Sequence, residues 1–206
     1  YRFKRIVKRP AKAPDPQQYQ RCKKHLAELE RRQERGEMEL AYADAAGFSL
    51  QAPQAMAWQH PKHPLWLEAQ SHGKRLNVFG FLRNNNAFEA VVFEQTINDD
   101  CVIAAIDHYI RHRTKDALPL HIVLDNAPSH HTDDMYKAQE RWRKKKVFIE
   151  YLTPYSPHLN RIEILWKHVK YHWLPLEAFQ NMKSLRHHLY TVLNGIGTKY
   201  RITFEI

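Results

Sequence analysis

Three carboxylates lie where side chains of this type can do chemistry. Asp125 directly follows the apolar run 122–124 in the stretch HIVLDNAPSHH. Asp44 lies within the alternating stretch ELAYADAAGFSL, and Glu163 lies in the first turn of an expected helix after YLTPYSPHLN. If the first two stretches are neighbouring strands of one sheet and the helix packs over them, the three acids meet at one place.

Three converging carboxylates repel one another unless protons or cations neutralise them. Carboxylate oxygens suit Mg²⁺ or Mn²⁺, whose octahedron is completed by water and substrate phosphate. Two such ions a few ångströms apart form a site that cleaves phosphodiesters. The sequence therefore predicts that Asp44, Asp125 and Glu163 are catalytic residues and ligands of two Mg²⁺ or Mn²⁺ ions.

Each acid taken alone also has an ordinary structural explanation. Asp44 and Asp125 precede small or turn-forming residues, with which an Asp side chain forms an Asx turn. Glu163 stands four residues before Lys167, the spacing of an ion pair along a helix. The joint pattern of the three acids, rather than any single one, favours the metal site.

The histidines and cysteines indicate no structural metal site. There are 14 histidines, but the adjacent His130 and His131 are expected to point apart, which argues against zinc. Asn126, His130 or His131 are instead expected beside the metals or the substrate. The two cysteines, Cys22 and Cys101, have no metal-binding spacing, and they indicate a reducing, cytosolic compartment.

Length and charge suggest one domain with a basic arm. The chain has 206 residues, 43% of them hydrophobic, and no apolar run long enough to span a membrane or to act as a secretory signal. Residues 1–35 hold twelve Lys/Arg and four acids, so +8 of the net charge of +10 lies in this arm. A basic arm indicates a polyanionic partner, most often nucleic acid, although a solvated charge run is the alternative. Because the chain begins at Tyr1 without methionine, we also expect residues upstream.

Hydrophobic periodicity predicts a mixed α/β fold. The antiparallel pattern of the first strands is followed by an alternation of strands and helices, which predicts a mixed sheet with helices on both faces. The fourth strand is expected to pair with the third through the turn at 84–86. The expected strands are 39–50, 55–60, 75–83, 87–95, 121–126 and 147–152, and the expected helices are 16–35, 99–113, 132–146, 161–173 and 182–194.

Three segments resemble the catalytic blocks of a known family. LAYADAAGF, HIVLDNAPSHH and YLTPYSPHLNRIEILWKHVK resemble those of DDE transposases in the bacterial insertion-sequence branch of the mariner superfamily. The third block, L-x-P-Y-S-P-x-L-N-x-I-E-x-L-W-K, is long and therefore specific. The resemblance runs from about residue 37 to about residue 175. Two positions depart from the family pattern: Ala45 stands where an acid is frequent, and Arg161 stands where proline is frequent.

The resemblance implies a ribonuclease H-like fold, a catalytic triad and a reaction. Asp44, Asp125 and Glu163 match the family's acids. Residues 37–206 would form the catalytic domain, and residues 1–36 the linker helix and the end of a truncated DNA-binding region. The implied partners are transposon ends and target DNA, in a complex that contains a homodimer. The expected DNA contacts are Arg2, Lys4, Arg5, Lys8, Arg9, Asn126, His130, Lys167 and Lys170.

The implied activity is cut-and-paste DNA transposition, in a bacterial cytoplasm and close to the nucleoid. Two alternatives stay open from the sequence. One is a ribonuclease H-like nuclease that uses the same acids without strand transfer. The other is a non-catalytic remnant of a transposase that binds DNA through its basic arm.

Overall fold

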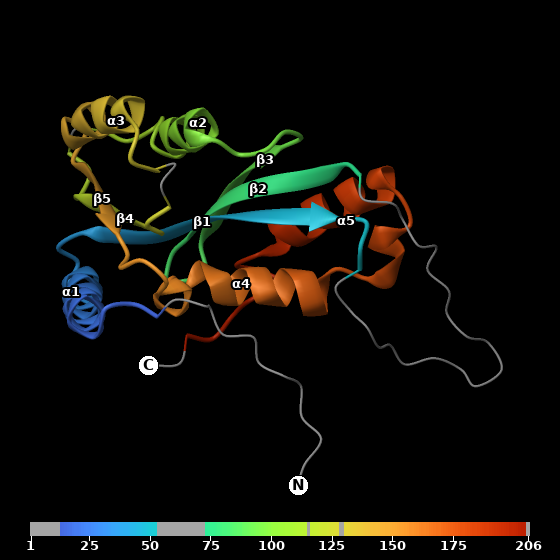
Figure 1. The fold of residues 1–206 in the computed structure, drawn as a ribbon, viewed down its shortest axis with the longest axis horizontal. Helices are drawn as coiled ribbons and strands as arrows, with labels where there is room; N and C mark the ends of the chain where they lie inside the picture. Colours follow the sequence, from blue (N-terminus) through green and yellow to red (C-terminus); the bar gives the residue numbers. More distant parts are fainter. Residues whose placement is uncertain (1–12, 53–72, 115, 128–129, 205–206) are drawn as a thin grey trace, which may run out of the picture.

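A computed structural model describes residues 13–52, 73–114, 116–127 and 130–204. Five strands form one mixed sheet in the order β3-β2-β1-β4-β5 (Figure 1). β1 pairs antiparallel with β2 and parallel with β4. The strands are β1 (Glu39–Ser49), β2 (Arg75–Leu82), β3 (Phe88–Phe93), β4 (Leu120–Leu124) and β5 (Val147–Tyr151).

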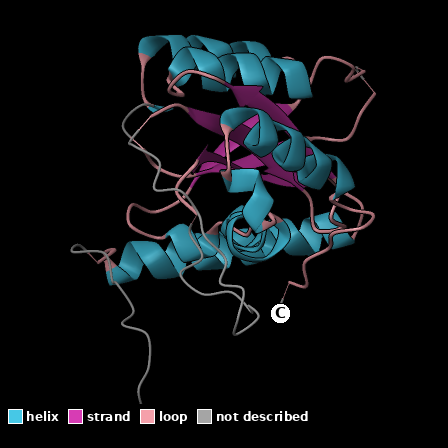
Figure 2. Ribbon diagram, turned by 90° about the vertical axis from the view of Figure 1, so that its right-hand side faces the viewer, coloured by secondary structure: helices cyan, strands magenta, loops and turns pink. Residues whose placement is uncertain are grey.

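Helices cover both faces of this sheet, so that it forms the middle layer of three (Figure 2). α2 and α3 lie on one side, and α1 and α4 lie on the other (Figure 1). The helices are α1 (Pro16–Glu34), α2 (Asp99–Tyr109), α3 (Asp133–Arg143), α4 (Ile162–His168) and α5 (Met182–Gly195). A π-helical segment, Val169–Trp173, continues α4.

The alternation of side chains along β1 divides the core in two. Leu40, Tyr42 and Phe48 pack with α1, α4 and α5, whereas Ala41 and Ala43 pack with α2 and α3. This division is the one that the period-two pattern of the sequence predicts, because neighbouring residues of a strand point to opposite faces. Small residues on the second face let α2 and α3 lie close to the sheet.

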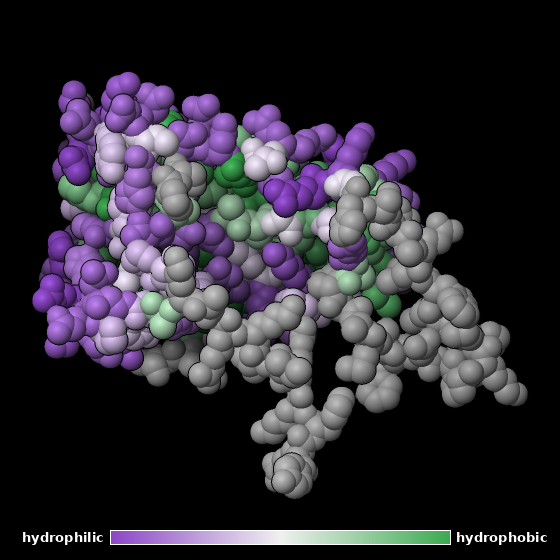
Figure 3. Space-filling model, viewed as in Figure 1, coloured by the Kyte–Doolittle hydropathy of each residue, from purple (hydrophilic) through white to green (hydrophobic). Residues whose placement is uncertain are grey.

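α1 is packed against the sheet and α4 through buried side chains. Leu26 and Leu29 belong to the core on the α4 face, and Asp15 caps the helix by accepting a hydrogen bond from the backbone N–H of Gln18 at 2.8 Å. Gly36, with φ of +71°, follows its last turn, where a left-handed conformation favours glycine. The exposed side chains over α1 and α3 are mostly hydrophilic (Figure 3).

Where the structure describes them, the observed elements follow the predicted ones, with differences at the ends of helices. The expected strand at 55–60 lies outside the described residues. α2 ends at Tyr109 rather than at 113, and the helix predicted over 161–173 changes from α-helical to π-helical at Val169. The predicted pairing of β2 with β3 across the turn at 84–86 is confirmed, and Asn86 adopts a φ of +65° there. Among the helices described, none is long and apolar enough to cross a membrane.

Candidate active site

The parallel pairing of β1 with β4 brings Asp44 and Asp125 side by side. Tyr42 and Val123 form the last matched pair of these strands, and each acid lies two residues further along its own chain. Tyr42 and Val123 both face the core under α4. Since side chains two residues apart share a face of a strand, the register directs both acids toward α4.

Close packing of α4 against the sheet places Glu163 over these two strands. Gly80 of β2 pairs with Asp44 in the sheet. A Cβ atom at Gly80 would meet the rings of Phe88 and Trp166 at 2.8 Å. Trp166 is buried on α4, and Glu163 lies in the first turn of the same helix. The missing side chain at Gly80 thus sets how near α4 lies to Asp44.

We expect Gly80→Ala to destabilise the domain by about 1–3 kcal/mol, because an added methyl group must displace Phe88 or Trp166. Urea unfolding monitored by tryptophan fluorescence measures this loss. Gly47→Ala is the matched control on the neighbouring strand, since its Cβ would meet an atom no closer than 3.3 Å, the Oδ1 of Asn77. Equal unfolding midpoints for the two variants would contradict this account of how α4 is seated.

Asn160 anchors the start of α4 to the strand that carries Asp44. Its side-chain Nδ2 donates a hydrogen bond of 3.0 Å to the carbonyl oxygen of Ala43, and the residue is only 2% exposed. Its Oδ1 is buried without a hydrogen-bond partner among the described residues. The sequence analysis did not single out Asn160, although the rare L-N-x-I-E spacing within the third block contained the signal.

Electrostatic repulsion couples the three acids. Burial and then repulsion by Glu163 and Asp125 raise the pKa of Asp44 from 3.8 to about 7, although a backbone hydrogen bond from Ala45 and the charge of Lys170 oppose the shift. Burial also raises the pKa of Glu163; Lys170 opposes this shift and Asp125 adds to it. The site is therefore a carboxylate cluster with Lys170 as its neighbouring cation, and it favours the binding of positive charge.

Asp125 is held by a buried histidine. His130 is 8% exposed, and its Nε2 lies 2.9 Å from the Oδ1 of Asp125. The backbone carbonyl of His130 accepts a hydrogen bond of 2.8 Å from Tyr151, whose hydroxyl in turn accepts one of 2.9 Å from Gln139. This chain of bonds from α3 and β5 orients the carboxylate. The DNA contact expected of His130 stays a prediction, and its observed contact is with Asp125.

An open cavity of about 740 Å³ adjoins the acids. Asp125 and Glu163 line it, together with Asn126 and His131, which are hydrogen-bonded to each other. The segment Leu152–Pro157 forms its other wall, including Tyr155, which has a φ of +61°. Lys167 is exposed on α4 and Lys170 is half-buried in the π-helical segment. The cavity leaves Asp125 and Glu163 open to a ligand, and Lys170 contributes positive charge beside the acids.

The remaining expected DNA contacts, Arg2, Lys4, Arg5, Lys8 and Arg9, lie outside the described residues. The DNA contacts of these five residues therefore stay predictions from the sequence.

The donor set fits a hard divalent cation in its chemistry. Three carboxylates that repel one another suit Mg²⁺ or Mn²⁺, which take oxygen ligands and retain water. Within the described ranges, no three His, Cys, Asp or Glu side chains already assemble into a coordination set. Ion binding would therefore draw in the carboxylates of Asp125 and Glu163, both of which are accessible to solvent.

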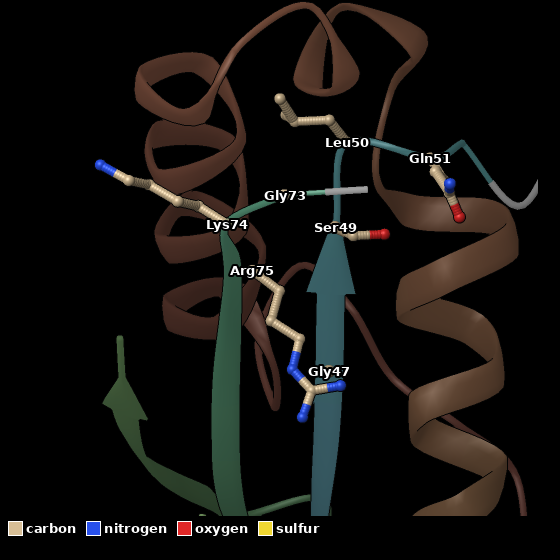
Figure 4. A pocket seen from close by; sticks show the side chains of 7 residues that line it. All are labelled: Gly47, Ser49, Leu50, Gln51, Gly73, Lys74 and Arg75. Carbon is tan, nitrogen blue, oxygen red and sulfur yellow. The ribbon is translucent and has the colours of Figure 1, made fainter. Parts of the chain in front are cut away.

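A second cavity lies at the far end of β1 and lacks such chemistry. Its volume is about 450 Å³, and Gly47, Ser49, Leu50, Gln51, Gly73, Lys74 and Arg75 line it. The Arg75 side chain runs along β1 toward Gly47, whereas Lys74 points away (Figure 4). None of these described lining residues is a carboxylate, so the acid cluster is the better candidate for catalysis.

A family model described as DDE superfamily endonuclease matches residues 39–186, a span that contains all three acids and well over half of the chain. The chain belongs to the DDE superfamily of endonucleases. A comparison with curated protein sequences finds no match.

Solved structures show that this DDE domain has the ribonuclease H-like fold. It aligns with a "Mos1 transposase paired-end complex with left transposon end" at a TM-score of 0.65 and 17% identity, covering 94% of this chain and 59% of that one. It aligns with a "Mos1 mariner paired end complex with Mn" at 0.60 and 16%, covering 94% and 60%. The "catalytic domain of Mos1 mariner transposase" gives 0.56 and 14%, covering 90% and 84%. The predicted mixed sheet flanked by helices is thus confirmed, and this chain spans about three fifths of the two longer transposase chains.

Proposed function

We propose that the chain is the catalytic part of a DDE transposase of the bacterial insertion-sequence branch of the mariner superfamily. The observation that carries this proposal is the coupled cluster of Asp44, Asp125 and Glu163 beside an open cavity, in a DDE superfamily domain. Transposon-end DNA would be the first substrate and target DNA the second. The place of action would be the bacterial cytoplasm, close to the nucleoid.

Each residue has a distinct part in this reaction. Asp44 and Asp125 would hold two Mg²⁺ or Mn²⁺ ions between them, and Glu163 would hold one of these ions. Bound ions of this kind polarise the phosphate and supply a water that is deprotonated near neutral pH. His130 keeps Asp125 oriented, and Lys170 places a positive charge beside the phosphate. A Mos1 complex with Mn supports the choice of ion.

The proposed reaction has two steps. In the first, a water oxygen bonds to phosphorus at the transposon end while the bond to the 3′ oxygen breaks, which frees a 3′-hydroxyl. In the second, that hydroxyl attacks a target phosphodiester, and a target 3′ oxygen leaves. The same three acids would serve both steps. A homodimer would bring two transposon ends together.

A nicking assay on transposon-end DNA with Mg²⁺ or Mn²⁺ tests this proposal. Metal-dependent nicking followed by joined strand-transfer products would support a transposase. Nicking without joined products would indicate the nuclease alternative. DNA binding without any nicking, in a protein that retains Asp44, Asp125 and Glu163, would indicate a non-catalytic remnant.

We expect the basic arm to account for most of the salt dependence of DNA binding. Replacing Arg2, Lys4, Arg5, Lys8 and Arg9 by Ala should reduce the magnitude of the slope of log K against log salt concentration by up to about 4.5, because each neutralised phosphate contributes about 0.9. Fluorescence anisotropy at several salt concentrations measures the slope. Substitution is preferable to deletion of residues 1–35, because Leu26 and Leu29 of α1 are buried in the core.

The matched control replaces Lys144, Lys145 and Lys146, which are exposed after α3. A larger loss of slope in this variant than in the arm variant would transfer the DNA contacts to the body and leave the arm a solvated linker.

A further inference from the structure

One carboxylate of α1 joins both elements that carry the site. The Oε1 atom of Glu30 accepts a hydrogen bond of 2.5 Å from the Tyr42 hydroxyl, and it lies 2.6 Å from the Nη2 of Arg161. Tyr42 is buried on β1, two residues before Asp44, and Arg161 directly precedes α4, two residues before Glu163. The single side chain of Glu30 thus connects α1, the strand of Asp44 and the helix of Glu163.

Arg161 is held on several sides rather than by one contact. Its guanidinium lies over the ring of Tyr42 at 5.8 Å and over the ring of Phe204 at 5.3 Å. Its Nη1 also lies 3.4 Å from the Oδ1 of Asn84. The side chains of Arg161 and Glu30 are 24% and 22% exposed. A planar guanidinium restrained by a carboxylate and two rings has one defined position.

The start of α4 needs such a restraint. No side chain caps α4 at Arg161, and the α-helical part of α4 has only seven residues. The buried Ile162, the bond from Asn160 to Ala43 and the contacts of Arg161 are among the interactions that fix this end. A carboxylate that shares an ion with residues of another element must be held to within about 0.5 Å.

We propose that Glu30 and Arg161 are positioning residues that set the place of Glu163 relative to Asp44. This inference rests on the proposed function, because the distance between these two acids matters only if they share an ion. α1 is then part of the catalytic machinery, as well as the linker to the upstream arm.

Four variants separate this role from general stability. Glu30→Gln and Arg161→Met remove the ion pair, and Arg161→Lys retains a cation at the same place. Glu28→Gln is the matched control: Glu28 is on the same helix and pairs only with Arg31 and Arg35 in the described residues, at the exposed surface. Melting temperatures identify any variant that does not fold, and Tyr42→Phe, which removes only the phenol bond, then replaces Glu30→Gln.

The first readout needs neither metal nor activity. Amide hydrogen exchange over residues 161–166 should become faster in Glu30→Gln and Arg161→Met, and should stay at the wild-type rate in Glu28→Gln. Arg161→Lys should restore part of the protection. Unchanged exchange in Glu30→Gln and Arg161→Met would overturn the inference.

The second readout is Mn²⁺ affinity, measured by titration calorimetry. Glu30→Gln and Arg161→Met should bind Mn²⁺ about 10-fold more weakly, as is usual when a residue that orients a metal ligand is lost. The kcat for cleavage should fall while the KM for DNA stays unchanged. Wild-type affinity in both variants would overturn the inference while leaving the proposed function intact. If the wild-type protein itself bound no Mn²⁺, the proposed function would fail, and hydrogen exchange would still decide whether Glu30 fixes α4.

Discussion

Asp125→Asn is expected to reduce Mg²⁺- or Mn²⁺-dependent cleavage by on the order of 10³-fold, since metal ions supply several kcal/mol to such reactions and about 1.4 kcal/mol corresponds to a factor of ten. Asn retains the shape of the side chain but loses the charge that attracts a cation. Single-turnover cleavage of transposon-end DNA at saturating enzyme measures the chemical step. Asp44→Asn and Glu163→Gln should have effects of similar size.

The control for this experiment is DNA affinity without metal, which these substitutions should leave unchanged or slightly raise, because they remove negative charge from the face proposed to bind DNA. Asp134→Asn is a matched surface variant, as Asp134 pairs with the exposed Lys137 on α3. If Asp125→Asn cleaved DNA at the wild-type rate, Asp125 could not be a metal ligand.

Without metal, Asp44→Asn is expected to stabilise the protein at pH 8. The pKa of Asp44 is raised from 3.8 to about 7 in the folded protein, so the folded state binds this proton more tightly than the unfolded state does. The contribution of Asp44 to the free energy of unfolding therefore falls as pH rises from about 4 to about 7. At about 1.4 kcal/mol per pKa unit, the gain in the Asn variant is at most about 4 kcal/mol. Urea unfolding with EDTA at pH 4 and pH 8 measures it.

Metal should offset this difference. At a Mn²⁺ concentration of about 1,000 times its Kd, the wild-type protein gains about 4.1 kcal/mol, whereas the variant gains little. A variant no more stable than wild type at pH 8 in EDTA would show that the carboxylates do not repel one another as described.

Glu150 supplies a pH reference of opposite sign. Burial raises its pKa, but hydrogen bonds from His121 and His25 outweigh this effect and lower it below 4.5. Its contribution to stability is complete above pH 4.5 and is lost as pH falls further. Glu150→Gln should therefore change the acid limb of the stability profile.

The sequence was sufficient to predict the elements of the site because each acid lies in a segment with strong local patterning. The alternation around Asp44 and the apolar run before Asp125 define two strands. The motif around Glu163 defines the start of a helix. What local patterning could not show is register, since the pairing of Tyr42 with Val123 joins residues 81 positions apart and depends on the whole sheet.

The residues missed by sequence reasoning act across the fold rather than along the chain. Arg161 was noticed only as a departure from a family pattern, yet it contacts Glu30 of α1 and the ring of Tyr42. The sequence shows Gly80 only as one glycine in an ordinary strand, because its contact with Trp166 depends on how α4 packs. His130 was expected beside the metals or the DNA, and its burial against Asp125 could not be read from the sequence because it depends on α3 and β5. Such contacts have no periodicity that a single sequence reveals.

The parallel pairing of β1 with β4 also dictates when the site forms. Antiparallel neighbours such as β2 and β3 are joined by a short turn. The paired residues of β1 and β4, in contrast, are 81 positions apart in the chain. Contacts between distant parts of a chain slow folding, because the entropy of the intervening loop is lost before the contacts form. Asp44, Asp125 and Glu163 therefore come together only when this pairing and the docking of α4 are complete. A nascent or partly folded chain has no assembled carboxylate cluster, so the proposed metal binding and DNA cleavage would arise only in the finished domain.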